Sequence, residues 1–426
     1  MIVAFYTLGC KVNQYDTQTM MELFRREGYQ IGDFQSYADI YVINTCTVTA
    51  MSDKKSRQMI SRANKRNPNA VLVVAGCYAQ RDAEYVLTLP GVRVALGNQN
   101  RSRIVSLVER VLHEDVSIDA VTEIREAVEF EELPAMCDGR TRAHLKIQEG
   151  CNRFCSYCII PFARGNVRSR SLQSIRMETE RLAKEGFSEF VLTGIHLSSY
   201  GTDCQSHLQE AMACISSVEG VERIRLSSLE PMILQDGFVQ YCAGNKKVCP
   251  QFHVSMQSGS DGVLRRMNRQ YTSEEYAARV ACIRKYIPNA AITTDVIAGF
   301  PGETEEEHRE TLDFIQKIGF ARLHVFPYSM REGTAAAKRS DQIEKAVKER
   351  RAHEIMKMGQ QMEHAYIDAQ LGSMEEVLAE EQEDGFTTGY TRNYIHAKMA
   401  GQYAQGEIIP VQLGVRENET VICKRR

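Results

Sequence analysis

Three closely spaced cysteines give this sequence its clearest chemical signal. Cys151, Cys155 and Cys158 lie in the segment GCNRFCSYCIIP, at intervals of four and three residues. Thiolates are the usual ligands of iron–sulfur clusters, and three of them can hold a cube of four irons while one iron stays open to a substrate or cofactor. Structural zinc is the alternative, but it usually takes a fourth protein ligand and favours paired CxxC motifs. The pattern therefore predicts a redox-active cluster in an active site.

Three further cysteines are far apart in the chain, yet each comes just after an apolar run. Cys10, Cys46 and Cys77 follow IVAFYTL, DIYVINT and AVLVVAG, and amphipathic stretches around 17–27 and 54–64 separate the runs. This alternation is typical of a parallel α/β sheet, whose strands end at one edge, where such sheets place their ligands. We expect the three thiols to lie together there. Isolated buried thiols are the alternative.

The bulk composition limits the classes of protein that are possible. The chain has 426 residues, of which 43% are hydrophobic and 25% charged, and its net charge is -3. These values exclude a disordered chain and a uniformly basic nucleic-acid coat, and the length predicts two or three domains. Thirteen cysteines favour metal or catalytic uses in a reducing compartment. The longest apolar stretch is far shorter than the ~20 residues of a membrane span, and no signal peptide is visible. We expect a cytoplasmic protein without a membrane segment.

The elements that must position the first cysteine group belong to a second pattern of alternating strands and helices. Its six candidate strands predict an incomplete (βα)6 barrel, in which chemistry takes place at the C-terminal strand ends. The expected strands are 143–148, 189–193, 222–227, 250–255, 290–296 and 322–326. An acidic stretch near 112–140 is expected to connect this barrel to the N-terminal α/β domain. A charged helix over 341–370 precedes short β-like runs that predict a small C-terminal β-barrel. The expected domains are 1–112, 137–368 and 369–426.

The spacing CxxxCxxC after the first barrel strand resembles the radical S-adenosylmethionine superfamily. The segments after the other strands, VLTGIHLSSYG, LSSLEP, HVSMQSGSDGVLRRMNRQY, TTDVIAGFPGETEEE and HVFPYSMREGT, resemble its methylthiotransferase branch. The resemblance implies that the open iron binds the methionyl group of S-adenosylmethionine, whose reductive cleavage gives a 5′-deoxyadenosyl radical. By position, it places Tyr157 near the adenine, Thr193 and Gly194 near the methionyl end, and Gln257 and Asp295 on the cofactor or substrate side. A turn-capping role is the structural alternative for Asp295. No residue is assigned as a catalytic acid or base.

The N-terminal segments TLGCKVNQYDT, NTC and GCYAQ resemble the domain that binds a second iron–sulfur cluster in the same branch. The resemblance implies two [4Fe-4S] clusters, of which the second carries the sulfur to be inserted. TLGCKVNQYDT is most similar to the MtaB-type tRNA methylthiotransferases, and the similarity covers nearly the whole chain. It implies methylthiolation at carbon 2 of N6-threonylcarbamoyladenosine, at position 37 beside the tRNA anticodon. The alternatives in the branch are isopentenyladenosine 37 and an aspartate of a ribosomal protein.

Two regions are candidates for contact with the anticodon loop of tRNA. The C-terminal segment resembles a TRAM domain, in which aromatic and basic side chains can stack on bases and contact phosphates, although they can also be core residues. These are Phe386, Tyr390, Arg392, Tyr394 and Lys398. The helix after Cys46 carries six basic residues, which can follow phosphates or form a solvated face. They are Lys54, Lys55, Arg57, Arg62, Lys65 and Arg66, with one nearby acid, Asp53.

Arginines near the barrel mouth, in RFC, PFARGNVRSRS and LRRMNR, add to this expectation of an RNA partner. The reaction also requires an electron donor and a sulfur source, whose identities the motifs do not specify. A protein of a different class, an iron–sulfur RNA-binding redox sensor without turnover, is the non-enzymatic alternative. The complete set of cofactor-binding segments argues against it, because a sensor has no use for them.

Overall fold

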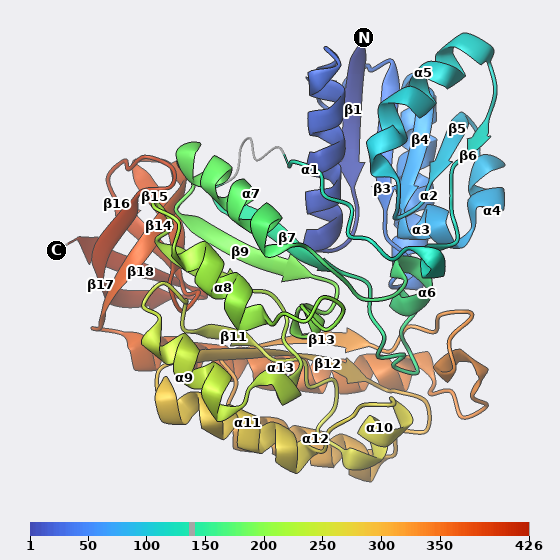
Figure 1. The fold of residues 1–426 in the computed structure, drawn as a ribbon. Helices are drawn as coiled ribbons and strands as arrows, with labels where there is room; N and C mark the ends of the chain where they lie inside the picture. Colours follow the sequence, from blue (N-terminus) through green and yellow to red (C-terminus); the bar gives the residue numbers. More distant parts are fainter. Residues whose placement is uncertain (136–140, 426) are drawn as a thin grey trace.

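The N-terminal part of the chain is a six-stranded parallel sheet with helices on both faces (Figure 1), and the computed structural model describes residues 1–135 and 141–425. The strand order is β2-β1-β3-β4-β5-β6. Its strands are β1 Ile2–Thr7, β2 Gln30–Gly32, β3 Ile40–Thr45, β4 Val71–Gly76, β5 Val92–Leu96 and β6 Ile118–Asp119. The expected parallel α/β fold is confirmed, and the three predicted apolar runs form its central strands β1, β3 and β4.

Helices cover both faces of this sheet. They are α1 Lys11–Arg26, α2 Ala50–Arg66, α3 Cys77–Arg81, α4 Ala83–Leu87 and α5 Ile104–Glu114. Met20 and Phe24 of α1 pack with α5 on one face, whereas Met59 and Ile60 of α2 pack with α3 and α4 on the other. Two layers of helices thus bury β3 and β4 along their whole length.

The central part is the expected incomplete barrel of six parallel strands. These strands are β7 Ala143–Glu149, β9 Glu189–Gly194, β10 Arg223–Leu226, β11 Gln251–His253, β12 Ala291–Ala298 and β13 Arg322–Pro327. Parallel bridges from Ile224 to Val248 and from Leu229 to Val254 join the two halves of the curved sheet. A short strand that sequence patterning did not predict, β8 Arg168–Ser169, runs antiparallel to β7.

Helices follow the strands of the central barrel, and the short helix after β7 contacts α3 of the N-terminal sheet. They are α6 Ile160–Arg164, α7 Leu172–Lys184, α8 Leu208–Ser216, α9 Asp236–Gly244, α10 Asp261–Arg266, α11 Ser273–Tyr286, α12 Glu305–Ile318 and α13 Lys345–Gln370. Short 3-10 helices lie at Arg101–Arg103, Ile124–Glu126, Leu197–Ser199, Pro231–Ile233 and Ala336–Lys338. Capping boxes begin α11 and α12, where Thr272 pairs with Glu275 and Thr304 with Glu307. The segment GETEEE therefore serves as a helix start as well as a strand-end loop.

The interior of the barrel is polar. Successive residues of a strand point to opposite faces, and on β12 Ile292, Val296 and Ala298 belong to the core shared with the outer helices. Asp295 therefore faces the interior. The same alternation turns a set of polar side chains inward, namely Lys146, Gln148, Thr193, Arg225, His253, Thr293, Asp295 and His324. Such a lining suits a polar substrate better than an apolar one.

The C-terminal part is a closed five-stranded barrel, as expected. Its strands are β14 Met374–Glu383, β15 Phe386–Thr391, β16 His396–Ala400, β17 Ile408–Glu417 and β18 Thr420–Arg425, in the order β14-β15-β16-β18-β17. The run 386–399 divides into two strands because a turn intervenes, in which Tyr394 has a φ of 69°. Among the described residues, no helix has the length and apolar character to cross a membrane.

The domain limits of 1–112, 137–368 and 369–426 remain a prediction. α5 and β6 continue the N-terminal unit past residue 112. Residue 137, where the second domain was expected to begin, and the cysteine at that position lie outside the described residues.

Candidate functional site

The N-terminal cysteines lie at the ends of three neighbouring parallel strands. Cys10 is the N-cap residue of α1 after β1, Cys46 follows β3, and Cys77 opens α3 directly after β4. Because β1, β3 and β4 are adjacent in the sheet, their C-terminal ends share one edge. We call these three residues the N-terminal triad. The structure thus brings together side chains that are 36 and 31 residues apart in the sequence.

Glycines allow the backbone to approach this triad closely. Gly9 has a φ of 106°, and a Cβ atom there would lie 2.8 Å from the Cβ atom of Cys46. Gly76 has a φ of 90°, and its Cβ would lie 2.3 Å from Oδ1 of Asn44. Both positions use the left-handed region, in which other residues are strained. The residue before Cys10 and the residue before Cys77 therefore have to be glycine for the thiols to converge.

Buried amides tie these strand ends together. The Asn13 amide donates to the carbonyl oxygens of Leu8 at 2.7 Å and Thr45 at 2.9 Å, which precede the first two cysteines. The Thr45 hydroxyl in turn donates to the carbonyl oxygen of Ala75 at 2.6 Å. The three strand ends are thus fixed relative to one another by side chains of the same edge.

Burial controls the ionisation of the thiols in the N-terminal triad. Burial, together with repulsion from the thiolates of Cys77 and Cys10, raises the pKa of Cys46 to about 11. Burial also raises the pKa of Cys10, although Arg164 acts against it. Cys10 is nonetheless exposed to solvent. Protein therefore surrounds much of this thiol, but solvent can still reach it. Thiols with raised pKa values ionise when a metal binds them.

Two donors from outside the triad point at Cys77. Nε of Arg164 lies 3.2 Å from its Sγ, and Nδ2 of Asn98 lies 3.5 Å away. Arg164 is fully buried, at 0% exposure. A buried guanidinium beside a sulfur atom fits a thiolate better than a neutral thiol, because a charged donor forms its strongest hydrogen bonds with an anion.

Cys151, Cys155 and Cys158, which we call the barrel triad, lie on one loop after β7. The Cys158 N–H donates to the Cys155 carbonyl oxygen at 2.9 Å, and the Ser156 N–H donates to the Met267 carbonyl oxygen at 2.9 Å. Burial and the neighbouring thiolates raise the pKa of Cys151 to about 11 and that of Cys158 to about 12. The loop therefore wraps the three sulfurs around one volume and is anchored to the segment after α10.

An arginine also donates to the barrel triad. Nη1 of Arg269 lies 3.2 Å from Sγ of Cys155, and Arg269 pairs with the buried Glu230 at 3.6 Å. Glu230 is shared with His196, whose Nε2 lies 3.3 Å away, and with Arg153. Each triad thus has one arginine directed at one of its sulfur atoms.

Both donor sets supply three thiols, the number that a four-iron cube can use while one iron stays open. Within residues 1–135 and 141–425, no group of three or more His, Cys, Asp or Glu side chains is arranged around the position of one metal ion. In such a cube, each of the three thiolates binds a different iron. The chemistry of the residues present therefore fits two iron–sulfur clusters.

The remaining predicted site residues surround the barrel triad or line the barrel. Tyr157 packs against Phe300 with ring centroids 6.4 Å apart, and burial raises its pKa well above the usual value. Thr193 and Gly194 end β9, where a Cβ on Gly194 would lie 2.8 Å from Oε1 of Gln148. Only a residue without a side chain allows this contact at the strand end.

The last predicted pair, Gln257 and Asp295, is joined through the backbone. The Gln257 N–H donates to the Asp295 carbonyl oxygen at 2.9 Å, and Gln257 has a φ of 69°. The Asp295 carboxylate lies 3.1 Å from Nε2 of His253, within β12 rather than in a turn. The turn-capping alternative for Asp295 is therefore wrong, because the residue belongs to a strand and faces the barrel interior.

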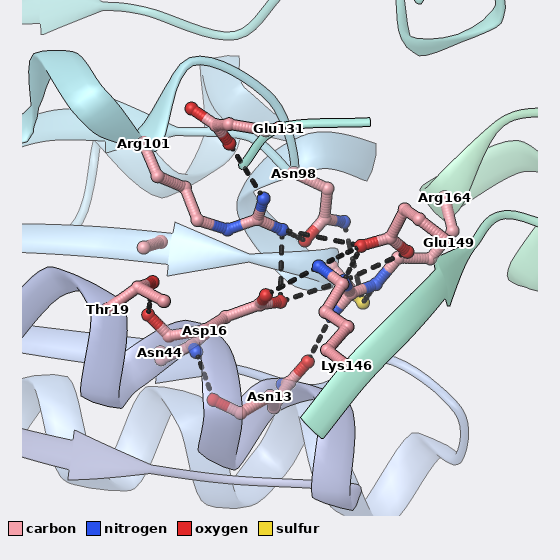
Figure 2. Close-up of polar contacts among 12 residues, drawn as sticks. Asn13, Asp16, Thr19, Asn44, Asn98, Arg101, Glu131, Lys146, Glu149 and Arg164 are labelled. Atoms are coloured by element: carbon pink, nitrogen blue, oxygen red, sulfur yellow. Dashed lines mark hydrogen bonds and ion pairs between the residues drawn. The ribbon is translucent and has the colours of Figure 1, made fainter. Parts of the chain in front are cut away.

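A network of buried charges joins the two triads, and sequence reasoning missed it. Asp16 accepts from Lys146 at 2.7 Å, from Arg164 at 2.9 Å and from Arg101 at 3.0 Å (Figure 2). Glu149, two residues before Cys151, accepts from Arg164 at 3.0 Å and also pairs with Lys146. Burial acts to raise the pKa of Asp16 and of Glu149, but the surrounding cations hold the first well below its usual range and lower the second to about 2.

The expectation that the barrel-mouth arginines contact RNA is wrong for most of them. Arg164, Arg168 and Arg170 are buried, the first two at 0% and 1% exposure. Arg266 pairs with Glu307 at 2.5 Å, and Arg269 faces Cys155. Carboxylates or sulfur atoms hold Arg164, Arg266 and Arg269 inside the protein. Arg168 donates to backbone carbonyl oxygens, and Arg170 donates to hydroxyl groups.

The basic helix α2 keeps exposed cations on its surface. Asp53, its one nearby acid, lies 2.9 Å from Arg331 and 3.4 Å from Arg81, so it does not neutralise the outer face. Arg57 donates to the Tyr78 hydroxyl, and Arg66 to the Phe34 carbonyl oxygen. The other four basic residues, Lys54, Lys55, Arg62 and Lys65, are exposed.

The residues proposed for stacking in the C-terminal barrel lie largely at its junction with the central barrel. Tyr390 and Tyr394 stack at 4.7 Å, and the guanidinium groups of Arg142 and Arg225 lie over the Tyr394 ring at 5.5 Å and 4.5 Å. Arg392 donates to the Val248 carbonyl oxygen at 3.1 Å. Tyr390 and Tyr394 lie outside the core cluster of the small barrel. Their ring faces contact each other and the arginines of the central barrel, while Tyr394 keeps 39% of its surface exposed.

Comparisons with known proteins agree with this arrangement. Residues 2–97 match the uncharacterized protein family UPF0004, and residues 145–315 match the radical SAM superfamily. The chain is 43% identical to "Threonylcarbamoyladenosine tRNA methylthiotransferase MtaB" of Bacillus subtilis, over 96% of this chain and 93% of that protein. It is 38% identical to the protein of that name from Aquifex aeolicus, over 96% and 100%.

Two further similarities are more distant. The chain is 33% identical to a tRNA-2-methylthio-N(6)-dimethylallyladenosine synthase of Pelotomaculum thermopropionicum, over 95% of this chain and 93% of that protein. Among solved structures, the radical S-adenosylmethionine methyltransferase TsrM of Kitasatospora setae matches with a TM-score of 0.60 at 15% identity, over 79% and 77% of the two chains. This last similarity supports the fold alone.

Proposed function

The chain belongs to the MtaB family of threonylcarbamoyladenosine tRNA methylthiotransferases, and from that premise we propose how its own residues divide the reaction. It is a radical S-adenosylmethionine transferase that adds a methylthio group to carbon 2 of N6-threonylcarbamoyladenosine 37 of tRNA, with two [4Fe-4S] clusters as cofactors. The observation that carries this function is similarity over almost the whole chain, combined with two separate groups of three convergent thiols.

Each triad holds one cluster in this proposal. The barrel triad supplies three thiolates for four irons and leaves a coordination position for S-adenosylmethionine, and the N-terminal triad holds the cluster associated with sulfur insertion. When bound, the clusters and S-adenosylmethionine supply what no side chain can, namely activation of an aromatic C–H bond and a methylated sulfur to replace the hydrogen. The protein contributes position, exclusion of water and electrostatics.

The residues around the barrel triad bind and orient S-adenosylmethionine. Tyr157 presents its ring beside the loop for the adenine, and the Thr193–Gly194 strand end gives the methionyl group room to approach the backbone. Asp295 faces the interior from β12, with His253 of β11 holding its carboxylate, and Gln257 follows β11 with its N–H on the Asp295 carbonyl oxygen. The polar interior fits a substrate whose threonylcarbamoyl group carries a carboxylate and several hydrogen-bonding atoms.

The exposed cations of α2 contact the tRNA backbone in this proposal. Lys54, Lys55, Arg62 and Lys65 lie on the helix that begins four residues after Cys46. Phosphate contacts of this kind supply affinity without reading sequence. These contacts would bring the anticodon loop to the N-terminal triad. A cytoplasmic location, an electron donor and a sulfur source complete the proposal.

Mass spectrometry of tRNA nucleosides tests this function. A bacterial strain that lacks the gene is compared with the same strain carrying the wild-type gene or a variant with Cys151→Ala. We expect the 2-methylthio form of threonylcarbamoyladenosine only with the wild-type gene, and its unmethylthiolated precursor in the other two strains. Loss of the dimethylallyl nucleoside instead would reassign the substrate within the family. Anaerobic reconstitution should give about eight irons per chain.

A further inference from the structure

One dipeptide, Arg164–Gly165, contacts both cysteine triads. Through its side chain, Arg164 donates from Nε to Sγ of Cys77 at 3.2 Å. Through its backbone, Gly165 accepts from the N–H of Cys151 at 3.0 Å. The dipeptide ends α6, which begins two residues after Cys158. Two adjacent residues of the barrel thus touch the first ligand of one triad and the last ligand of the other.

The backbone around this dipeptide is closely packed at two glycines. Gly150, immediately before Cys151, has a φ of 73°, and a Cβ there would lie 1.8 Å from the Asn166 carbonyl oxygen. Gly165 has a φ of 69°, and its Cβ would lie 2.4 Å from the Ile124 carbonyl oxygen. Side chains at either position would push the loops apart. The two glycines therefore keep the barrel triad and the dipeptide in close contact.

The guanidinium of Arg164 is oriented by groups on both sides of the interface. Its Nη1 lies 2.9 Å from Oδ2 of Asp16 on α1 and 3.0 Å from Oε2 of Glu149 on β7, and its Nη2 donates to Oδ1 of Asn13 (Figure 2). Asn98, the second donor to Cys77, also donates to the Ala163 carbonyl oxygen at 2.7 Å. A rigid planar fork held at its other nitrogens leaves Nε–H aimed at the sulfur.

We propose that Arg164 is a positioning residue that raises the reduction potential of the N-terminal cluster and fixes that cluster relative to the barrel triad. This inference rests on the proposed function, because it assumes that Cys10, Cys46 and Cys77 hold a cluster. Reduction adds negative charge to a cluster, and a buried cation that donates to a ligand sulfur stabilises the reduced form. Arg164 belongs to the barrel, so the barrel sets the electronic properties of a cluster bound by the N-terminal sheet.

The test measures the potentials of the two clusters separately. The full-length protein is reconstituted anaerobically as wild type, Arg164→Gln, Arg164→Lys and Arg101→Gln, and each is titrated potentiometrically with electron paramagnetic resonance detection. Added S-adenosylmethionine changes the signal of the barrel cluster and so identifies it. Arg101 is the matched control, since it is also buried, at 4% exposure, and pairs with Asp16 at 3.0 Å, but it makes no hydrogen bond to a cysteine sulfur in the part of the chain that the structure describes.

We expect Arg164→Gln to shift the potential of the N-terminal cluster to more negative values, with the barrel cluster unchanged. Arg164→Lys, which keeps the charge but lacks the directed Nε–H, should give a smaller shift in the same direction. Arg101→Gln should move the potential less than Arg164→Gln. An equal shift in the Arg101 and Arg164 variants would overturn the proposal, because it would assign the effect to buried charge in general.

Iron content and 5′-deoxyadenosine formation distinguish a failure of this inference from a failure of the proposed function. If Arg164→Gln loses iron, the Arg164→Lys variant with full iron content decides, and an unchanged potential in it refutes the role of Arg164. If the wild-type protein forms 5′-deoxyadenosine but the Arg164 variants have wild-type cluster potentials, only this inference is contradicted. Wild-type protein that binds no cluster at Cys10, Cys46 and Cys77 contradicts the proposed function itself.

Discussion

The two triads each bring three cysteines together, but they are built from different elements of the fold. The barrel triad lies on one loop of eight residues after a single strand, whereas the N-terminal triad needs three strand ends and the helices between them. The loop is anchored within the barrel through Met267 and Arg269, while the N-terminal triad is completed from another part of the chain by Arg164. A motif on a loop is self-contained, but a site made from strand ends depends on the packing between regions.

The largest effect should come from replacing either triad by alanine. Removal of Cys151, Cys155 and Cys158 should abolish both 5′-deoxyadenosine formation and methylthiolation, because the open iron that binds S-adenosylmethionine is lost. Removal of Cys10, Cys46 and Cys77 should abolish methylthiolation but leave 5′-deoxyadenosine formation. Each triple variant should keep about four of the eight irons, measured anaerobically.

Cys282→Ala serves as the control for these variants, since this half-buried cysteine belongs to neither triad. It should keep the iron content and both activities of the wild type. If the N-terminal triple variant also lost 5′-deoxyadenosine formation with four irons still bound, the two sites would not be separable, and the contrast between them would fail.

The buried network between the triads should have the next largest effect, on folding. Asp16→Asn leaves Arg101, Lys146 and Arg164 with too little negative charge around them, and breaking a buried ion pair typically costs about 3–5 kcal/mol. We expect a clear fall in the midpoint of thermal unfolding of the cluster-free chain. Asp115→Asn is the control, because Asp115 pairs with Arg93 at the surface and its loss should leave the midpoint unchanged. Equal midpoints in wild type and Asp16→Asn would show that the network does not hold the interface.

A second buried carboxylate, Glu189, lies at the end of the central barrel opposite the triads. Its contribution to folding stability should depend on pH. Glu189 is 0% exposed and lies 2.9 Å from Arg225 and 2.7 Å from Arg142. Burial acts to raise the pKa of Glu189, but the arginines together have the larger effect and lower it to about 2. Because this pKa is depressed in the folded state, the stabilisation is fully present above the ordinary value near 4.5 and is lost as the pH falls toward 2.

The loss should amount to about 3 kcal/mol, following from 1.36 kcal/mol per unit of pKa shift. Glu189→Gln should already be less stable than wild type at pH 7 and should change less between pH 5 and pH 3. Unfolding midpoints of the cluster-free chain across this range measure the difference. Parallel pH profiles for the two proteins would show that Glu189 is not the group responsible.

The sequence predicted the positions of the helices and strands far better than the burial and contacts of charged side chains. The runs that became β1, β3 and β4 are mostly apolar, and the six barrel strands carry apolar residues at alternate positions, so local patterning was sufficient to locate them. The segment PFARGN, by contrast, looks like surface charge, yet Arg164 meets Cys77 and Asp16, which are 87 and 148 residues away. Whether an arginine is buried depends on such distant partners, and periodicity does not reveal them. Polar α1 residues that face the barrel, among them Asn13 and Asp16 of KVNQYD, were missed for the same reason.

The smallest expected effect comes from replacing exposed cations of α2. It tests whether the RNA approaches the N-terminal triad or the barrel triad. Lys55 and Arg62 are exposed and seven residues apart on α2, on one face of the helix that begins near Cys46, whereas arginines around the barrel triad are mostly buried or paired. Replacing both by glutamine should weaken tRNA binding modestly and reduce the slope of log affinity against log salt by about one for each phosphate that the variant no longer neutralises. Lys345→Gln, at an exposed lysine on α13 that pairs with Glu349, should leave the slope unchanged. An unchanged slope in the α2 variant would move the RNA-binding surface away from the N-terminal triad, because exposed cations that touch phosphates must release counterions on binding.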